Sequence, residues 1–455
     1  MSKTIGMGIG LLMVVLLGIP ARAGAESIEQ RLERLEKRVE EQDRIIRVQQ
    51  RQLDERATAP AAAAPATAAA QPAAPAAPAS PDTLRAYWKD GLRFETADKK
   101  FQTHVGGRIQ IDGSNFSETK AMKDEFGSFQ NGSELRRARL QVDGLIYGRV
   151  DYMIEYDFAT GDAEAKDVYL GLIDVPYAGN LRVGHFKEPF SLEEVTSDNY
   201  ITFMERALPN AFAPSRNMGL MASNAVLDER MTWALGAFRS SSDAFAQDRE
   251  DGGWAGTGRI TGLPLWLDEG RSLVHLGASA SYRDPQGEAE RFRSRPEAHQ
   301  APYIVDTGDV MADDVARFGG ELAAVHGPVW FQGEFIDALT DGEGPQRNLY
   351  GYYVQAGWFL TGENRPYKRE TGVIDRVRPR HSFLVDGPGA WELAARWSSI
   401  DLDSGAVRGG QAHDVTLGVN WYLNPMTRVS GNYVFSDRIG VGEMNAFLMR
   451  FWLYF

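Results

Sequence analysis

Apolar and polar residues alternate with a period of two along most of the chain after residue 100. The segment 150–158, VDYMIEYDF, places valine, tyrosine, isoleucine and phenylalanine on one face and mainly acidic residues on the other. The segments 101–111, 391–398 and 414–421 repeat this pattern. Segments of about ten residues with one apolar, aromatic face are typical of strands that cross a membrane in a β-barrel. The alternation alone also fits a soluble β-sandwich.

Sixteen segments carry the alternation clearly enough to be predicted as strands. They are 101–113, 135–146, 149–158, 166–173, 181–187, 217–223, 231–238, 254–261, 273–282, 316–325, 329–336, 350–360, 390–398, 413–422, 427–435 and 446–455. The number is even, and with a periplasmic N-terminus the periplasmic connections are mostly short. The outer connections then include long loops at 187–216 and 283–315, which is the asymmetry of outer-membrane barrels. The connection 361–389 is an exception, because it is long and periplasmic.

The last nine residues, FLMRFWLYF, form a strand with one fully apolar face. That face consists of Phe447, Met449, Phe451, Leu453 and Phe455. A terminal strand that ends in phenylalanine resembles the signal by which outer-membrane barrels are recognised for insertion, and soluble proteins rarely end in this way. We therefore predict an all-β fold, a 16-stranded antiparallel transmembrane β-barrel in residues 83–455. The expected partners include outer-membrane lipid and, through Phe455, the barrel-assembly machinery.

Residues 1–25 have the three parts of a secretory signal peptide. Lys3 supplies the positive charge, residues 5–19 are apolar, and Ala23-Gly24-Ala25 fits the cleavage pattern of small residues. We expect the mature chain to begin at Glu26, with cleavage after Ala23 as the alternative. A membrane anchor is the other interpretation, but the apolar stretch is shorter than the roughly 20 residues that a spanning helix needs. The predicted location is the bacterial outer membrane.

A charged helical segment and a spacer follow the signal peptide. Residues 26–56 have a heptad-like stripe at Ile28, Leu32, Leu35, Val39, Gln42, Ile46, Gln49 and Leu53. So narrow a stripe favours a periplasmic coiled coil, although a single amphipathic helix on another surface is the alternative. Residues 57–82 are mostly alanine and proline, and six prolines favour an extended linker.

Charge and composition exclude several classes of function. The chain of 455 residues has a net charge of −13, which argues against nucleic-acid binding, and it contains no cysteine, which excludes disulfides and thiolate metal sites. Residues 1–82 hold ten basic and ten acidic residues, so the whole excess of acid lies in the barrel region. The seven histidines are scattered, and no HExxH, GxSxG or Walker motif occurs. We expect no enzyme activity, catalytic residue, cofactor or metal site.

Motifs along the barrel region resemble the phosphate-selective porin family, the outer-membrane porins O and P. The matching segments are ELRRARL at 134–140, GHFKEPFS at 184–191 with FMERA at 203–207, RFRSRPE at 291–297 with IVDTG at 304–308, WFLTGENRPY at 358–367, GAWELAAR at 389–396 and TLGVNWYLN at 416–424. The resemblance covers essentially all of residues 100–455. It implies a 16-stranded barrel that forms a homotrimer and conducts small anions. In that family, the third and fifth loops fold inward and basic side chains bind phosphate.

The candidate anion-binding residues are arginines in one strand and in the fifth loop. Arg137 and Arg139 share a face with polar residues, so parity places them in the lumen, whereas Arg136 would face lipid unless it lies at the rim. The resemblance places three further arginines in the inward loop, namely Arg291, Arg293 and Arg295. Arginine forks match phosphate oxygens. These three could form a basic ladder or could be solvated charge, because Glu288, Glu290 and Glu297 flank them.

Two other connections bear on selectivity. The periplasmic connection holds six basic residues, Arg365, Lys368, Arg369, Arg376, Arg378 and Arg380, which could draw anions at the exit or form a solvated loop. The third loop reads LEEVTSDN at 192–199, where the family's phosphate porins have lysines, and this counts against high phosphate selectivity. We therefore predict an outer-membrane porin that passes small anions, phosphate or a related oxyanion, by passive diffusion. The alternatives are a general small-solute porin or a non-conducting structural barrel.

Overall fold

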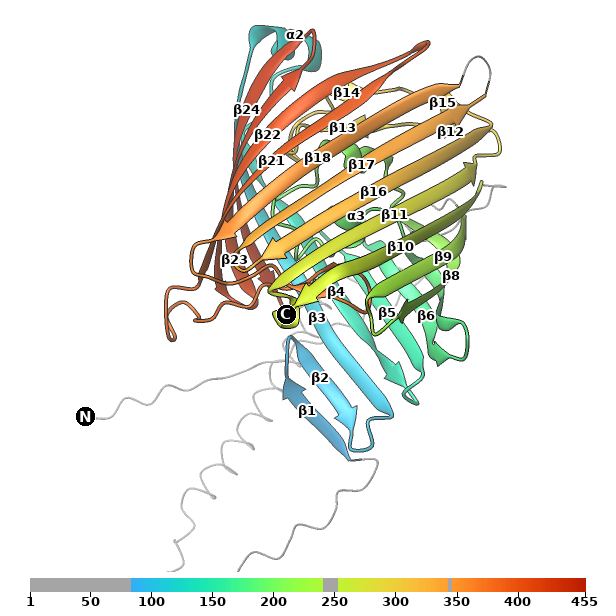
Figure 1. Cartoon of the computed structure of the whole chain (residues 1–455). Helices are drawn as coiled ribbons and strands as arrows, with labels where there is room; N and C mark the ends of the chain where they lie inside the picture. The colour runs from blue at the N-terminus through green and yellow to red at the C-terminus, as the bar shows by residue number, and fades with distance from the viewer. Residues whose placement is uncertain (1–82, 240–252, 343–345) are drawn as a thin grey trace, which may run out of the picture. The chain divides into compact units, whose positions relative to one another are not determined.

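Sixteen antiparallel strands close into a barrel in the part of the chain that the computed structural model describes, residues 83–239, 253–342 and 346–455 (Figure 1). The strands are β3 (Phe101–Glu118), β4 (Gly132–Ile146), β5 (Val150–Asp157), β6 (Glu164–Val175), β7 (Gly179–Lys187), β8 (Arg216–Val226), β9 (Met231–Arg239), β10 (Trp254–Leu267), β11 (Ser272–Asp284), β16 (Asp314–His326), β17 (Val329–Asp341), β18 (Arg347–Phe359), β21 (Ala390–Ser404), β22 (Val407–Asn424), β23 (Thr427–Arg438) and β24 (Gly442–Tyr454). Pairing of β24 with β3 closes the barrel. The signal peptide, coiled coil and linker predicted in residues 1–82 lie outside the described residues.

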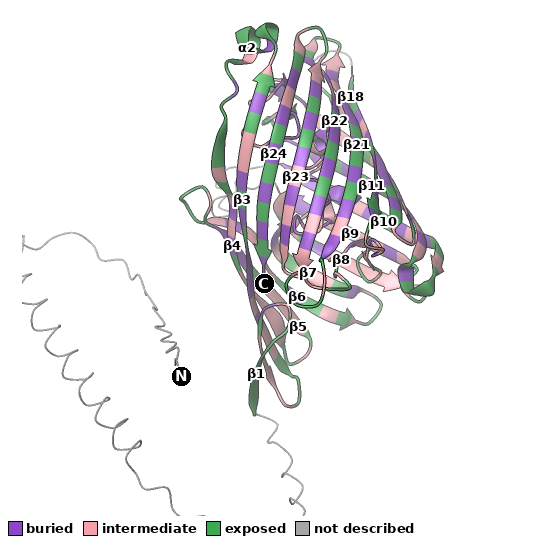
Figure 2. Ribbon diagram, turned by 90° about the vertical axis from the view of Figure 1, so that its left-hand side faces the viewer, coloured by how far each residue is buried: buried purple, intermediate pink, exposed green. Residues whose placement is uncertain are grey.

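The two faces of each strand differ as the sequence pattern requires. Along β24, the side chains of Phe447 and Phe451 are exposed on the outside, whereas those of Arg450 and Trp452 are buried inside. Figure 2 shows the same alternation of buried and exposed residues along β22, β23 and β24. An apolar outer face and a polar interior are the reverse of a soluble β-sandwich and suit a barrel in lipid. The prediction of a transmembrane barrel is confirmed.

All sixteen predicted strands are present, and several extend beyond their predicted ends. β22 begins at Val407 rather than at residue 413, and β3 continues to Glu118 rather than to residue 113. These extensions are rich in glycine and polar residues. A strand that projects beyond the apolar part of a membrane no longer needs an apolar outer face, so its period-two signal fades.

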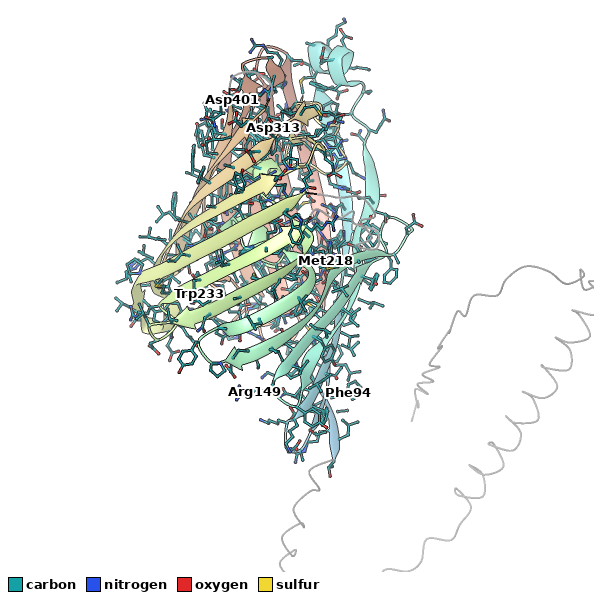
Figure 3. All side chains as sticks on the ribbon, turned by 90° about the vertical axis from the view of Figure 1, so that its right-hand side faces the viewer. Phe94, Arg149, Met218, Trp233, Asp313 and Asp401 are labelled. Atoms are coloured by element: carbon teal, nitrogen blue, oxygen red, sulfur yellow. The ribbon has the colours of Figure 1, made fainter. Side chains whose placement is uncertain are left out.

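The barrel has a turn end and a loop end. Short connections such as 147–149, 327–328 and 425–426 lie at the turn end, which is the periplasmic end in barrels of this kind. In Figure 3, Phe94 and Arg149 mark the turn end, and Asp313 and Asp401 mark the loop end. Two short helices also lie in connections, α2 (Lys120–Phe126) and the 3-10 helix η2 (Asp268–Gly270). None of the described helices combines the length and the apolar character that crossing a membrane requires.

A hairpin that the sequence analysis did not predict precedes the barrel. It consists of β1 (Leu84–Trp88) and β2 (Leu92–Thr96), and β2 pairs with β3 below the point where β24 ends (Figure 1). The backbone of Phe455 exchanges hydrogen bonds of 2.8 and 3.0 Å with Gly107, and its ring stacks on Trp88. The hairpin therefore extends the sheet at the seam where the first and last barrel strands meet.

Three long connections fold into the lumen, and we name them by their residues. The third loop, residues 188–215, contains α3 (Leu192–Val195) and the 3-10 helix η1 (Leu208–Phe212). The fifth loop, residues 285–313, contains the two-residue strands β12 (Ala289–Glu290), β13 (Arg293–Ser294), β14 (Val305–Asp306) and β15 (Val310–Met311). The long turn, residues 360–389, contains β19 (Tyr367–Lys368) and β20 (Val373–Ile374). The fifth loop and the long turn carry nine of the eleven candidate site residues.

Candidate functional site

The third loop is attached to the inner wall at the start of α3. The carboxylate of Glu334, on β17, accepts hydrogen bonds from the backbone N–H groups of Leu192 and Glu193, both at 2.8 Å. The Tyr353 hydroxyl donates a further hydrogen bond of 2.5 Å to Glu334. These contacts hold the first turn of α3 against the wall, where Glu193 meets Arg396 of β21 and Glu194 meets Lys187 of β7.

The fifth loop packs on the third loop through an apolar contact. The rings of Phe212 and Phe292 lie 5.3 Å apart, and both side chains are buried together with Ile304 and Phe190. The pairs β12–β15 and β13–β14 fold the fifth loop into two short hairpin-like ladders. The two loops thus form one packed body inside the barrel.

A cavity of about 260 Å³ lies between the third loop, the fifth loop and strand β4. Its charged lining includes Arg136, Arg137, Arg206, Arg293, Arg295, Glu205 and Glu297. The structure therefore brings together residues from three segments that are far apart in the sequence. Five guanidinium groups against two carboxylates give this cavity an excess of positive charge, and we take it as the candidate anion site.

Two of the five candidate anion-binding arginines lie outside this cavity. Arg139 donates a hydrogen bond of 2.6 Å to Asp157 and pairs with Glu155 at 3.2 Å, both on β5. Arg291 is 45% exposed in its side chain and forms an ion pair of 2.6 Å with Asp306 within the fifth loop. Arg137, Arg293 and Arg295 are the three predicted residues that line the cavity.

Parity misplaced Arg136, because β4 contains a β-bulge. Gln110 pairs with Arg137 while the next residue of β3, Ile111, pairs with Leu135, so Arg136 is the extra residue on β4. A bulge re-aims the side chain of the extra residue. Arg136 accordingly points inward and makes a fork of two 2.9 Å hydrogen bonds to Glu205. The expectation that Arg136 faces lipid is wrong.

Every acidic residue of the third loop is paired with basic residues of the wall or of the loop itself. Asp198 contacts Arg108, Arg137 and Arg139, Glu205 contacts Arg136 and Arg450, Glu194 contacts Lys187 and Arg206, Glu193 contacts Arg396, and Glu188 contacts Arg283. These carboxylates are the residues that made the third loop look unfavourable for anions. Because their charge is cancelled at contact distance, they leave little negative charge facing the cavity.

Arg293 and Arg295 differ from the other cavity arginines in their partners. Their Cζ atoms each lie 4.2 Å from the ring centroid of Tyr303. Within the described residues, neither forms an ion pair with a carboxylate, and the buried Nε of Arg295 has no hydrogen-bond partner. An aromatic ring fixes a guanidinium group without neutralising its charge. These two arginines are thus positioned and still positively charged toward the cavity.

The long turn closes part of the lumen at the turn end. Arg365 is buried, its Nη2 donates to the Tyr200 carbonyl oxygen at 3.0 Å, and its guanidinium lies over Trp330. Arg376 and Arg378 bind Asp90 of the β1–β2 hairpin at 2.8 and 2.9 Å. Hydrogen bonds from Arg378 hold the pKa of Asp90 below its ordinary value.

The remaining basic residues of the long turn are spread over its surface. Arg369 and Lys368 face Glu229 and Glu370 at 3.5 and 3.7 Å, and Arg380 is exposed. The six basic residues of the long turn are thus divided between contacts with the Asp90 hairpin or the third loop and the surface of the turn end. A second cavity of about 500 Å³ lies between this segment and the third loop, and its lining mixes both signs of charge.

Some residues of the site were not found from the sequence. Arg108, Arg396 and Arg450 each face the lumen as a single arginine in its strand, so no row of like charges drew attention to them. Inward parity within their strands was the available signal. Tyr303 could not be found in this way, because it lies in a loop without periodicity.

A closed transmembrane barrel with connections folded into its lumen and a basic cavity between them defines a porin, and this fold points to a channel rather than an enzyme. The chain belongs to the phosphate-selective porin O and P family, whose sequence profile matches residues 103–455. Family and fold together place the protein in the outer membrane.

The chain is similar to several known proteins. It is 29% identical to porin O of Pseudomonas aeruginosa over 386 residues, which cover 76% of this chain and 85% of porin O. An uncharacterised protein of Caulobacter vibrioides is also 29% identical, over 78% of this chain and 72% of its own length. Among solved structures, a loop-deletion mutant of the Vibrio cholerae outer-membrane protein OmpT superposes with a TM-score of 0.50 at 13% identity, over 78% of this chain and 100% of the other. That likeness shows the fold alone.

Proposed function

We propose that this porin is anion-selective and that the cavity between the third and fifth loops holds an oxyanion such as phosphate in passing. The observation that carries the proposal is the unequal pairing of charge around the cavity. The carboxylates of the third loop form ion pairs, whereas Arg293 and Arg295 pack on Tyr303 and have no carboxylate partner among the described residues. Guanidinium groups bind phosphate oxygens through two parallel hydrogen bonds.

The geometry also suits conduction. A site that binds an ion too tightly blocks a channel, so several weak sites in series are better. Arg137 and Arg206 line the same cavity but already share their charge with Asp198 and Glu194, which weakens their pull on a passing anion. Local charge in a narrow passage matters more than the total of −13, because distant exposed charges are screened beyond roughly 8–10 Å at physiological salt.

Reversal potentials in a KCl gradient across a planar bilayer test the proposal. We expect stepwise conductance and a reversal potential closer to the equilibrium potential of chloride than to that of potassium. We also expect added phosphate to reduce the chloride current. Anion preference without phosphate block would support a general small-solute porin instead. Cation preference would contradict the proposal, and absence of conductance would favour a structural barrel.

We also propose that the protein is a homotrimer. Residues 26–56 would form a periplasmic coiled coil, and the Ala/Pro-rich residues 57–82 would link it to the barrel. The C-terminal strand would be the segment by which the barrel is recognised for insertion. The heptad stripe in the sequence and the family membership support the assembly. Sedimentation in mild detergent, with and without residues 26–82, measures it. A native monomer would contradict it.

A further inference from the structure

Arg396 lies at the point where both inward loops meet the wall. It is on β21, only 2% exposed, and it ends the segment GAWELAAR. Its Nε and Nη2 donate hydrogen bonds of 3.0 and 2.5 Å to Glu297 of the fifth loop. Its Nη1 bonds to Glu193 of the third loop at 3.2 Å, and Nη2 also donates to the Glu205 carbonyl oxygen at 2.9 Å. One guanidinium group therefore holds both loops.

The carboxylate of Glu297, the fifth-loop partner of Arg396, is fixed by further contacts. Glu297 also accepts hydrogen bonds from Ser398 at 2.6 Å and from Thr416. Its backbone has φ +43°, a left-handed conformation that residues other than glycine rarely adopt. Such a conformation persists where the surroundings determine it. Arg295 is two residues away in the same loop, and its carbonyl oxygen accepts a hydrogen bond of 2.8 Å from the backbone N–H of Glu297.

The third-loop end is held in a similar way. The guanidinium of Arg396 lies 4.4 Å from the ring centroid of Phe203. The carboxylate of Glu205 binds Arg136, whereas the backbone carbonyl oxygen of Glu205 accepts a hydrogen bond from Arg396. Glu193 accepts a hydrogen bond of 3.0 Å from the backbone of Ala207, next to Arg206. Arg396 itself is absent from the residues that line the anion cavity. It touches the segments that carry the cavity arginines but not the cavity.

We propose that Arg396 is the positioning residue of this pore: it fixes the third and fifth loops on β21 and so sets the spacing of the cavity arginines. The proposal rests on the proposed function for the identity of the anion site. Lysine would not serve, because its compact ammonium lacks the planar five-donor fork that reaches Glu297, Glu193 and a carbonyl oxygen from different sides. An arginine saturated by such partners acts through geometry rather than through free charge.

Two single variants separate positioning from charge. Arg396→Gln removes a positive charge, and Glu297→Gln removes a negative one, so a pure charge effect would shift the reversal potential in opposite directions. Positioning predicts that both variants weaken phosphate block by about tenfold and broaden the distribution of unit conductances. The double variant should be no worse than the worse single variant, because both substitutions break the same contact. Opposite shifts that cancel in the double variant would overturn the proposal.

Further variants complete the test. Arg396→Lys keeps the charge and should behave like Arg396→Gln, whereas native block and conductance in this variant would overturn the proposal. Arg149→Gln is the control for loss of a barrel arginine, since Arg149 donates to the Asp174 carbonyl oxygen at the turn end, outside the cavity. Migration of unboiled samples on gels verifies folding. If native protein shows no phosphate block, the proposed function fails, but the spread of conductances still tests the positioning role.

Discussion

The third and fifth loops both fold into the lumen, yet they contribute charge in opposite ways. The third loop brings carboxylates that neutralise arginines of the wall, as Asp198 does for Arg108, Arg137 and Arg139. The fifth loop brings Arg293 and Arg295, which rest on Tyr303 without a carboxylate partner. The comparison shows that pairing, rather than the count of charged residues, decides how much charge a loop leaves free. The third-loop carboxylates are structural, whereas Arg293 and Arg295 of the fifth loop have no carboxylate partner among the described residues.

The largest expected effect is on stability, from a change in the third loop. Asp198→Asn keeps the shape of the side chain but leaves three buried arginines without their shared carboxylate. Removing one partner of a buried ion pair typically costs about 3–5 kcal/mol. We expect a lower temperature for conversion of the folded to the unfolded gel band. Arg295→Gln, which breaks no ion pair, is the comparison and should leave that temperature nearly unchanged. Equal stability of the two variants would remove the distinction between the loops.

The smallest expected effect is at the turn end, where Asp90 binds Arg376 and Arg378. The folded pKa of Asp90 is lowered, so this contact stabilises the fold above the ordinary pKa of about 3.9 and is lost as the pH falls through the lowered value. Arg376 also donates to the Tyr200 hydroxyl, so loss of the Asp90 contact would loosen the third loop only at Tyr200.

Current recordings as the pH is lowered stepwise from 7 measure this effect. We expect slightly noisier current only once the pH falls through the lowered pKa of Asp90, and Asp90→Asn should show the same noise already at pH 7. Both Asp90 pairs lie at the turn end, away from the cavity between the two loops, so phosphate block at pH 7 should remain native in this variant. Loss of block in Asp90→Asn would show that the hairpin controls the cavity, which contradicts the assignment of the site to the two loops.

The sequence was informative where periodicity governs structure. Each strand needs an apolar face toward lipid, so period two located all sixteen strands and the inward position of Arg137 and Arg139. The period-two argument failed at Arg136, because a β-bulge shifts the inward and outward positions of β4 by one residue. The residue types around the bulge do not reveal it.

Pairings between loops and wall had no comparable signal in the sequence. Asp198 and Arg108 are 90 residues apart, and Glu193 and Arg396 are 203 residues apart. Without those pairings, the sequence shows the third loop only as an acidic segment that would repel anions. Arg291, Arg293 and Arg295 also appear equivalent in the sequence, although Asp306 withdraws Arg291 from the cavity. Family resemblance supplied the idea of inward loops, but contact geometry decides which of their charges are free.

Phosphate block of chloride current in Arg293→Gln/Arg295→Gln channels tests the central claim most directly. Hydrogen bonds to charged groups contribute about 1.5–3 kcal/mol each, so loss of both guanidinium groups should weaken block by at least tenfold. Arg291→Gln is the matched control from the same loop and should retain near-native block. The folded gel band should persist in both, because neither substitution breaks a buried ion pair. Native block in the double variant, or equal loss in the control, would contradict the account.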